Sequence, residues 1–290
     1  MNSVANNYMK IISSIVEMHK TSLDLRNKGK NIGFVPTMGA LHKGHTSLIE
    51  RAKKDNTAVI LSIFVNPTQF TPGEDYRSYP RDIEKDKAIA SDIGVDYLFL
   101  PSADEMYPEG FKTFVNVEDI TEPLCGKFRP GHFKGVATVV LKLFNIVIPH
   151  RAYFGEKDYQ QLLVIKRIVK DLNLDIEIVN MATIREDDGL AMSSRNRYLN
   201  QKERLSAAAI YRAMEIFQEM IKNNEKIPQK IVNEMERIIK NEDGIKIDYI
   251  SICNPDTLKD LKVINGSVLA AIAVRIGKTR LIDNCVVEEK

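Results

Sequence analysis

The chain has 290 residues, of which 44% are hydrophobic and 28% are charged. These proportions are close to the globular average and exclude a generally disordered chain. The 41 basic and 39 acidic residues leave a net charge of +2, which is too weak a field for a nucleic-acid partner unless the charge is clustered.

Three cysteines, Cys125, Cys253 and Cys285, are odd in number and widely spaced, without a CxxC pair. This usage favours a reducing compartment over a disulfide framework or a zinc site. The sequence has no run of about 18 apolar residues, and polar residues interrupt its N-terminal segment. We therefore expect a soluble, cytoplasmic protein with no membrane partner.

The first part of the chain alternates helical and strand patterns. A helix is expected after residue 10, with Ile11, Ile15 and Met18 on one face, ending near residues 27–29. Continuous apolar runs predict strands at 31–36, 58–67 and 95–101, with helices at 45–55 and 81–93. Because strands alternating with helices are typical of right-handed βαβ crossovers, we predict a Rossmann-like, doubly wound parallel α/β sheet.

The alternation resumes further along the chain and then changes character. Helices are expected at 136–148 and 159–172, and strands at 151–156 and 175–183. Beyond this point the patterns predict helices at 201–223 and 228–241, a strand at 247–253, and a hairpin of 267–276 and 279–287 joined at Gly277 and Lys278. We expect a Rossmann-like domain at 1–182 and a smaller C-terminal α+β domain at 183–290.

The most informative stretch is FVPTMGALHKGH, residues 34–45, in which a strand runs through two glycines and two histidines into a helix. Glycines allow close approach of a ligand, and the first amides and dipole of a helix attract anions. His42 and His45 are three residues apart, so they share a face if the helix begins early. As donors they could bind a nucleoside triphosphate and its departing pyrophosphate. The sequence has neither GxGxxG after the strand nor GxxxxGK[ST], which argues against a dinucleotide dehydrogenase and a P-loop protein.

A second polar stretch is AMSSRNRYL, residues 191–199, expected to be a short loop. Ser193 and Ser194 can donate hydrogen bonds, and Arg195 has a forked charge suited to phosphate oxygens. Taken alone, these residues are equally typical of helix capping before Gln201.

A third stretch is FGEKDYQQL, residues 154–162, where a strand and a glycine precede Lys157 and the N-cap candidate Asp158. Lys157 is placed like a phosphate ligand, although an isolated lysine is usually solvated. Gln69 and Gln161 lie near expected strand ends, where ligands of open α/β sheets bind. Each could orient a hydroxyl or carboxylate, or could simply form surface hydrogen bonds.

Seven motifs follow one another in the order of a known family: PTMGALHKGH, IFVNPTQF, YPR, EMYP, RPGHFKGVATVV, YFGEKDYQQL and DGLAMSSRNRYL. On these motifs the chain resembles the pantoate–β-alanine ligase (pantothenate synthetase) family of the class I synthetase-like nucleotidyltransferase superfamily. HxGH alone is typical of the superfamily, whereas NPTQF, FGEKDYQQL and SSRN are specific to the ligase.

The resemblance implies a reaction in which pantoate and ATP form pantoyl adenylate and pyrophosphate, and the β-alanine amine then displaces AMP. It implies Mg²⁺ with ATP, without naming protein ligands for the metal, and a homodimer. By motif, it implies that ATP is bound by Met38, Gly39, Ala40, Leu41, His42, Lys43, Gly44, His45, Gly155, Glu156, Lys157, Asp158, Ile184, Met192, Ser193, Ser194 and Arg195.

The resemblance also assigns roles to single residues. His45 is the implied proton donor, and His42, Lys157 and Arg195 are the other implied catalytic groups. Gln69 is the implied ligand of pantoate and β-alanine, and Gln161 that of pantoate. The implied second domain, 183–290, acts as a lid that closes over the site.

One residue departs from the family pattern, because members more often have proline at the position of Ala182. Losing the constraint on φ could loosen a hinge between the domains.

Two other functions stay open. A nucleotidyltransferase that leaves AMP on its product shares the HxGH site but is generally a shorter, single-domain protein, and a non-catalytic nucleotide sensor would not consume ATP. The near-neutral charge and short length argue against an aminoacyl-tRNA synthetase, because they leave no evident tRNA-binding module.

Overall fold

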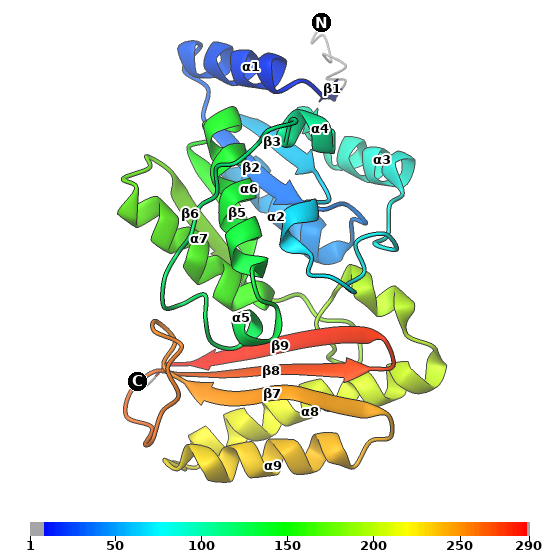
Figure 1. Ribbon diagram of the computed structural model, residues 1–290, viewed down its shortest axis with the longest axis vertical. Coiled ribbons are helices and arrows are strands. Elements are labelled where there is room, and N and C mark those ends of the chain that lie inside the picture. Colours follow the sequence, from blue (N-terminus) through cyan, green and yellow to red (C-terminus); the bar gives the residue numbers. More distant parts are fainter. Residues whose placement is uncertain (1–8, 289–290) are drawn as a thin grey trace, which may run out of the picture. The chain divides into compact units, whose positions relative to one another are not determined.

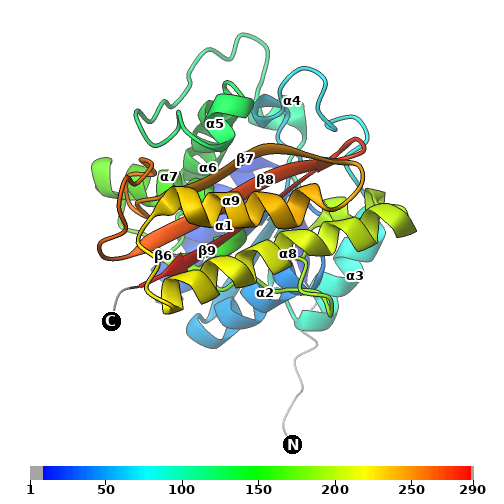
Figure 2. The same ribbon diagram turned by 90° about the horizontal axis from the view of Figure 1, so that it is seen from below.

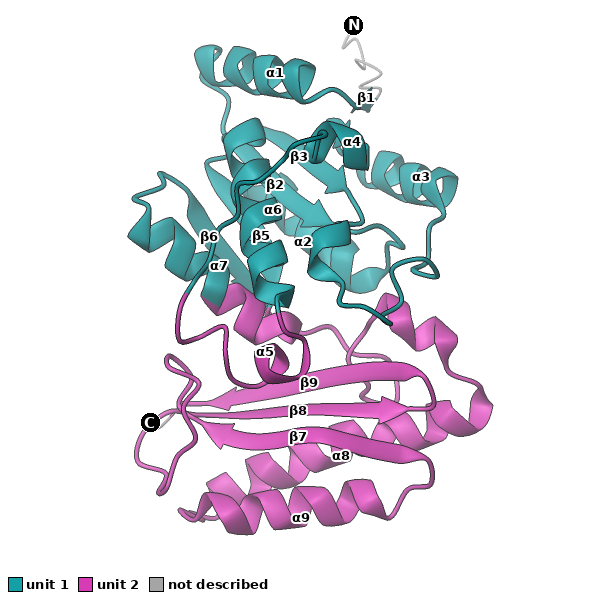
Figure 3. Cartoon of the chain, in the orientation of Figure 1, with its two compact units in different colours: residues 1–117, 131–155, 164–181 teal, residues 118–130, 156–163, 182–290 magenta. Residues whose placement is uncertain are grey.

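The computed structural model describes residues 9–288, which form two compact units (Figure 3). Unit 1 contains the described residues up to 117, together with 131–155 and 164–181. Unit 2 contains 118–130, 156–163 and the described residues from 182 onward. From the sequence we expect a domain boundary between residues 182 and 183, which would place 118–130 and 156–163 in the first domain rather than with unit 2. That boundary stays a prediction.

Unit 1 is built on a six-stranded parallel sheet in the order β1-β4-β3-β2-β5-β6 (Figure 1). Its strands are β1 (Lys10–Ile12), β2 (Ile32–Thr37), β3 (Ala58–Ile63), β4 (Tyr97–Phe99), β5 (Arg151–Gly155) and β6 (Glu177–Met181). The order reverses direction between β2 and β5, so the predicted doubly wound parallel sheet is confirmed. Every residue of β3 is buried, which explains its continuous apolar sequence.

Helices separate the strands of unit 1. They are α1 (Ile15–Asn27), α2 (Lys43–Asp55), α3 (Ile83–Ile93), the short α4 (Ala103–Met106), α6 (His132–Val147) and α7 (Tyr159–Asp171), whose first residues cluster with unit 2. α1 packs against α6, and α2 packs against α3. α1, α2 and α6 also contact β2 at the centre of the sheet, whereas the edge strands β1 and β6 are largely exposed or half-buried.

The predicted start of the first helix after residue 10 is wrong. Lys10–Ile12 is an edge strand, in which Ile11 pairs with Leu98 of β4. The helix begins only at Ile15, because the Ser14 side chain accepts a hydrogen bond from the Glu17 amide at 3.4 Å and caps it. The short apolar triplet before the cap thus adds a strand to the sheet.

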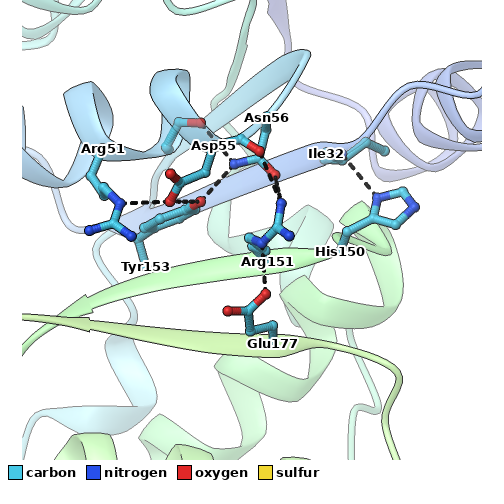
Figure 4. A network of polar contacts seen from close by, with 9 residues as sticks. Ile32, Arg51, Asp55, Asn56, His150, Arg151, Tyr153 and Glu177 are labelled. Carbon is cyan, nitrogen blue, oxygen red and sulfur yellow. Dashed lines mark hydrogen bonds and ion pairs between the residues drawn. The ribbon is translucent and has the colours of Figure 1, made fainter.

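A polar network at the amino ends of β2 and β5 fixes the C-terminus of α2 (Figure 4). The Tyr153 hydroxyl donates to Asp55 Oδ2 at 3.0 Å and accepts from Asn56 Nδ2 at 2.7 Å. Arg151 donates to the Asp55 carbonyl at 2.9 Å and pairs with Glu177 of β6 at 2.7 Å. Burial raises the pKa of Tyr153 to about 12, so the phenol stays protonated and can donate. The network therefore anchors α2 to β5 and β6.

Unit 2 contains a three-stranded antiparallel sheet of β7 (Ile245–Cys253), β8 (Val268–Ile276) and β9 (Thr279–Val287) in that order. Helices α8 (Gln201–Lys222) and α9 (Pro228–Lys240) pack on one face of the sheet (Figure 2). The predicted hairpin is confirmed, since Ile276 pairs with Thr279 across Gly277 and Lys278. α5 (Cys125–Phe128) also belongs to this unit. In the described part of the chain, no helix combines the length and the apolar character needed to cross a membrane.

Candidate active site

The turn between β2 and α2 carries the paired histidines. Gly39 and Ala40 have φ values of +82° and +52°, so the chain takes two successive left-handed steps before α2. His42 is the N-cap, and its Nδ1 accepts from the Gly44 amide at 3.1 Å. His45 Nδ1 accepts from the His42 amide at 3.4 Å, and the two rings lie 4.0 Å apart. The expectation that both histidines share one face of an early helical turn is confirmed.

These capping bonds determine which ring nitrogen carries hydrogen. A backbone N–H can only donate, so Nδ1 of His42 and of His45 must accept. A neutral imidazole with an accepting Nδ1 has its hydrogen on Nε2. Each ring therefore presents Nε2–H as its donor, at the positive end of the α2 dipole.

Asp86 of α3 supports this turn, and the sequence patterns do not identify it. Its side chain is buried, and its two carboxylate oxygens accept from the amides of Ala40 and Leu41, both at 2.8 Å. A Cβ on Gly39 would lie 2.8 Å from Asp86 Oδ2 and 2.9 Å from Ile63. The sequence does contain one signal that could have identified Asp86. It is a carboxylate one helical turn before Ala90, on the face of α3 that is buried, where a charged residue needs partners.

Gln69 ends a 3-10 helix, Pro67–Gln69, that follows β3. Asn66 Oδ1 accepts from the Thr68 amide at 3.3 Å and from the Tyr107 hydroxyl at 2.8 Å. Its Nδ2 must therefore donate, and it does so to Gln69 Oε1 at 3.0 Å. Gln69 Nε2 contacts Met38 Sδ at 3.0 Å. The network fixes Nε2 as the donor of Gln69 and joins this residue to the β2–α2 turn.

The start of α6 packs directly on this 3-10 helix. His132 Nδ1 lies 2.8 Å from the Gln69 carbonyl, and Asn66 Nδ2 donates to the Gly135 carbonyl at 3.1 Å. A Cβ on Gly135 would lie 2.3 Å from the Thr68 carbonyl oxygen. Only glycine permits this approach. In the sequence, His132 and Gly135 stand out only as members of a family motif.

A pocket of about 200 Å³ opens in unit 1 beside the turn. It lies at the carboxyl ends of β2 and β3, where ligands of open α/β sheets bind. Its lining is Met38, Gly39, Ile63, Phe64, Val65, Tyr76, Arg81, Ile83, Asp86, Pro101 and Ala103. The pocket thus combines apolar walls with the carboxylate that holds the turn.

The predicted residues of FGEKDYQQL are divided between the units. Gly155 ends β5 in unit 1, whereas Glu156–Asp158 forms a 3-10 helix in unit 2 that leads into α7, which contains Gln161. Lys157 Nζ lies 3.7 Å from Asp158 Oδ1. Asn284 of β9 donates to the carbonyls of Glu156 and Lys157.

The predicted loop around Ser193 is more regular than expected. Ser194–Tyr198 forms a 3-10 helix, and the Ser193 hydroxyl oxygen caps it by accepting from the Arg195 amide at 3.3 Å. The Met192 amide donates to the Ile184 carbonyl at 2.9 Å, which brings two of the predicted ATP-contacting positions together. The expectation of a loop at 191–199 is therefore wrong for 194–198, because a serine cap starts a helical turn there.

The described residues offer no cluster of three or more His, Cys, Asp or Glu side chains suited to holding a metal ion.

A doubly wound parallel sheet with two histidines capping the helix after β2 defines a nucleotide-binding α/β protein of the HxGH type. Residues 10–286 match the model of the pantoate-beta-alanine ligase family, and the chain belongs to that family. The pantothenate synthetase of Caldicellulosiruptor bescii is 58% identical over 97% of this chain and 100% of that protein. The pantothenate synthetase of Thermodesulfovibrio yellowstonii is 56% identical over the same shares of both.

Solved structures of the family agree with this assignment. The pantothenate synthetase of Thermus thermophilus superposes with a TM-score of 0.90 at 45% identity, over 96% of this chain and 99% of that one. The pantoate-beta-alanine ligase of Francisella tularensis, complexed with β,γ ATP and β-alanine, has a TM-score of 0.79 at 40% identity, over 96% and 97%.

Proposed function

We propose that the protein ligates pantoate and β-alanine with ATP, through a pantoyl-adenylate intermediate that yields AMP and pyrophosphate. The observation that carries the proposal is the histidine-capped start of α2 in a chain that matches the family over residues 10–286. The Francisella relative is complexed with both an ATP compound and β-alanine, which supports these two substrates.

In the first step the pantoate carboxylate attacks the α-phosphorus of ATP. Negative charge then develops on the departing pyrophosphate, where hydrogen-bond donors aimed at it lower the barrier. His45 donates a hydrogen bond from Nε2–H to this charge, which is the form in which the neutral ring can serve the donor role implied for it, and His42 adds a second donor from the neighbouring ring. The positive end of the α2 dipole acts in the same sense.

The other proposed ligands follow from the family motifs. In unit 1, residues 38–45 and Gly155 bind ATP, and Gln69 binds pantoate and β-alanine, donating from Nε2 to a substrate oxygen. In unit 2, residues 156–158, Ile184 and residues 192–195 bind ATP, and Gln161 binds pantoate. Lys157 and Arg195 provide charge for the phosphates.

In the second step the β-alanine amine attacks the carbonyl carbon and AMP leaves. The amine resembles lysine, with a pKa of about 10.4, so on the order of one molecule in a thousand is uncharged at neutral pH. The site must therefore select or generate the free base. The acyl adenylate is already activated, so no side chain needs to become acylated.

We propose that Mg²⁺ enters with the ATP phosphates, because the described residues form no carboxylate cage for it. Its chemistry is neutralisation of phosphate charge. The roles proposed for His42, His45 and Gln69 do not depend on a metal ligand from the chain.

Product analysis with ATP, pantoate and β-alanine, each omitted in turn, tests the proposal. Pantothenate, AMP and pyrophosphate should form in equal amounts only with all three substrates. An adenylylated product that retains AMP would instead favour the nucleotidyltransferase. ATP that is bound but never consumed would favour a sensor.

The homodimer, the cytoplasmic location and the lid role of the C-terminal domain stay predictions. Light scattering on the purified protein measures the first, since a dimer of this chain has twice the mass of 32.9 kDa.

A further inference from the structure

Two adjacent residues of β9, Asp283 and Asn284, contact segments that are far away in the sequence. Successive side chains of a strand point to opposite faces, so one residue serves each face of the small sheet. Asp283 lies on the face of Leu281, which packs in the core with α8 and α9. Asn284 points to the other face.

On its face, Asn284 holds the turn that precedes α7. Nδ2 donates to the Glu156 carbonyl at 3.0 Å and to the Lys157 carbonyl at 2.7 Å. Both partners are carbonyl oxygens, so only an NH₂ group can satisfy them together. An aspartate of the same shape would put an oxygen in the place of Nδ2, where it would face both carbonyl oxygens without a hydrogen to donate.

On the opposite face, Asp283 holds Arg185. Its side chain is fully buried, and it accepts two bonds from the guanidinium, at 2.6 and 3.2 Å. Asp283 Oδ1 also accepts from the Asn284 amide at 2.8 Å, which links the two residues directly. A buried carboxylate that accepts this many hydrogen bonds is held firmly in one position.

Arg185 connects Asp283 to the segment that contains Ile184 and Met192. Its guanidinium donates to the Gly189 carbonyl at 3.0 Å and lies 4.8 Å from the ring of Tyr211 in α8. Arg185 also pairs with Ala191 in an isolated antiparallel bridge. The turn between Ile184 and Met192 is therefore closed by its own backbone and held by Asp283.

We propose that Asp283 and Asn284 are positioning residues for ATP, holding the 156–158 segment and the 184–195 segment on opposite faces of β9. The inference rests on the proposed function, because the ATP role of both segments belongs to it. Neither residue is itself assigned a contact with a substrate. A change at Asn284 should therefore act through the backbone that carries Lys157.

The test is Asn284→Asp in the full-length protein, measured first by equilibrium binding of ATP and then by steady-state kinetics. Losing two hydrogen bonds to the turn should weaken ATP binding and raise the KM for ATP about tenfold or more. The KM for β-alanine should change less than about threefold. Asn284→Ser, which removes the amide without adding charge, should shift in the same direction and covers the case in which the aspartate variant fails to fold.

Asn56→Asp is the matched control, because Asn56 Nδ2 also donates twice, to the Ala52 carbonyl at 2.8 Å and to Tyr153 at 2.7 Å, in unit 1. It should lower the melting temperature and leave the KM for ATP unchanged. A double-mutant cycle of Asn284→Ser and Lys157→Ala should be non-additive in ATP affinity, since one residue acts through the other.

The inference would be overturned if the Asn284 variants bound ATP as tightly as the wild-type protein. It would also be overturned if the Asn284 variants raised the KM for ATP and the KM for β-alanine equally, or if Asn56→Asp raised the KM for ATP as much as they do. Wild-type protein that binds ATP but makes no pantothenate would overturn the proposed function alone, and the binding comparison would still decide the role of Asn284. Wild-type protein that binds no ATP would overturn both.

Discussion

Asp86→Asn is the substitution that separates support of the catalytic turn from ordinary helix packing. The carboxylate satisfies two backbone amides, those of Ala40 and Leu41, with one oxygen each at 2.8 Å. Asparagine keeps the size but has only one carbonyl oxygen. One of the two amides must then face an NH₂ group and lose its acceptor.

The expected cost follows from the burial of Asp86, which is only 1% exposed. Leaving one buried amide without an acceptor costs about 1–3 kcal/mol, and the remaining bond loses the charge that strengthens it. We expect the free energy of unfolding of unit 1 to fall by about 2–3 kcal/mol. Gly39 and Ala40, at φ values of +82° and +52°, should then relax and displace the His42 cap.

Urea denaturation and steady-state kinetics together measure this effect. The KM for ATP should rise at least about tenfold, beyond what lower stability alone explains at a temperature where the variant is folded. Asp82→Asn is the control in the same helix, because Asp82 caps α3 and its Oδ1 accepts from the Lys85 amide at 3.2 Å, a bond that the asparagine oxygen can also accept. If Asp86→Asn and Asp82→Asn have equal stabilities and equal KM values for ATP, the support assigned to Asp86 is refuted.

Three further substitutions test the site and the fold. His45→Ala should slow pantoyl-adenylate formation at least about a hundredfold in a single turnover, the usual scale for one transition-state donor, and near-normal adenylation by the folded variant would remove His45 from the mechanism. Gly135→Ala should raise the KM for pantoate, because the new Cβ would lie 2.3 Å from the Thr68 carbonyl and push away Gln69. Gly110→Ala is its control: alanine there strains the backbone at a φ of +81° but has nothing within 4 Å to displace, so stability should fall while the KM for pantoate stays the same. Equal KM values in the two variants would contradict the contact. Burial, reinforced by Arg26, lowers the pKa of His150, whose Nδ1 accepts from the Ile32 amide at 3.0 Å. The folded protein favours the neutral ring, so the free energy of unfolding should fall as pH drops below about 6.5 and level off below the folded-state pKa. His150→Gln should flatten this pH dependence. Identical pH profiles for the variant and the wild-type protein would contradict the contribution assigned to His150.

Much of the fold follows from local patterns in the sequence. The apolar runs at β2 and β3 and the Gly277–Lys278 hairpin are encoded within a few residues, and each strand begins within one residue of the predicted start. The predicted strand at 58–67 is too long, because β3 ends at Ile63 and a 3-10 helix begins at Pro67. Lys10–Ile12 is different, because three residues have no detectable period and become a strand only by pairing with β4. The start of α1 depends on a single capping serine.

The candidate site likewise has some residues that local sequence predicts and others that depend on contacts distant in the chain. The HxGH turn is local, so the sequence predicts the shared face of His42 and His45. Asp86 reaches the amides of this turn from 45 and 46 residues further along the chain, and His132 reaches Gln69 across 63 residues. A single sequence contains no signal for such distant pairs, since each residue looks ordinary within its own helix.

The path of one oxygen atom tests the central claim of an acyl-adenylate ligase most directly. If the pantoate carboxylate attacks the α-phosphorus, one of its oxygens bridges the carbonyl carbon and phosphorus in the intermediate. Attack by β-alanine at the carbonyl carbon then leaves that oxygen on AMP. Pantoate labelled with oxygen-18 in its carboxylate should therefore give AMP that carries one labelled oxygen, detected by mass spectrometry. Unlabelled AMP formed alongside pantothenate would contradict the acyl-adenylate route.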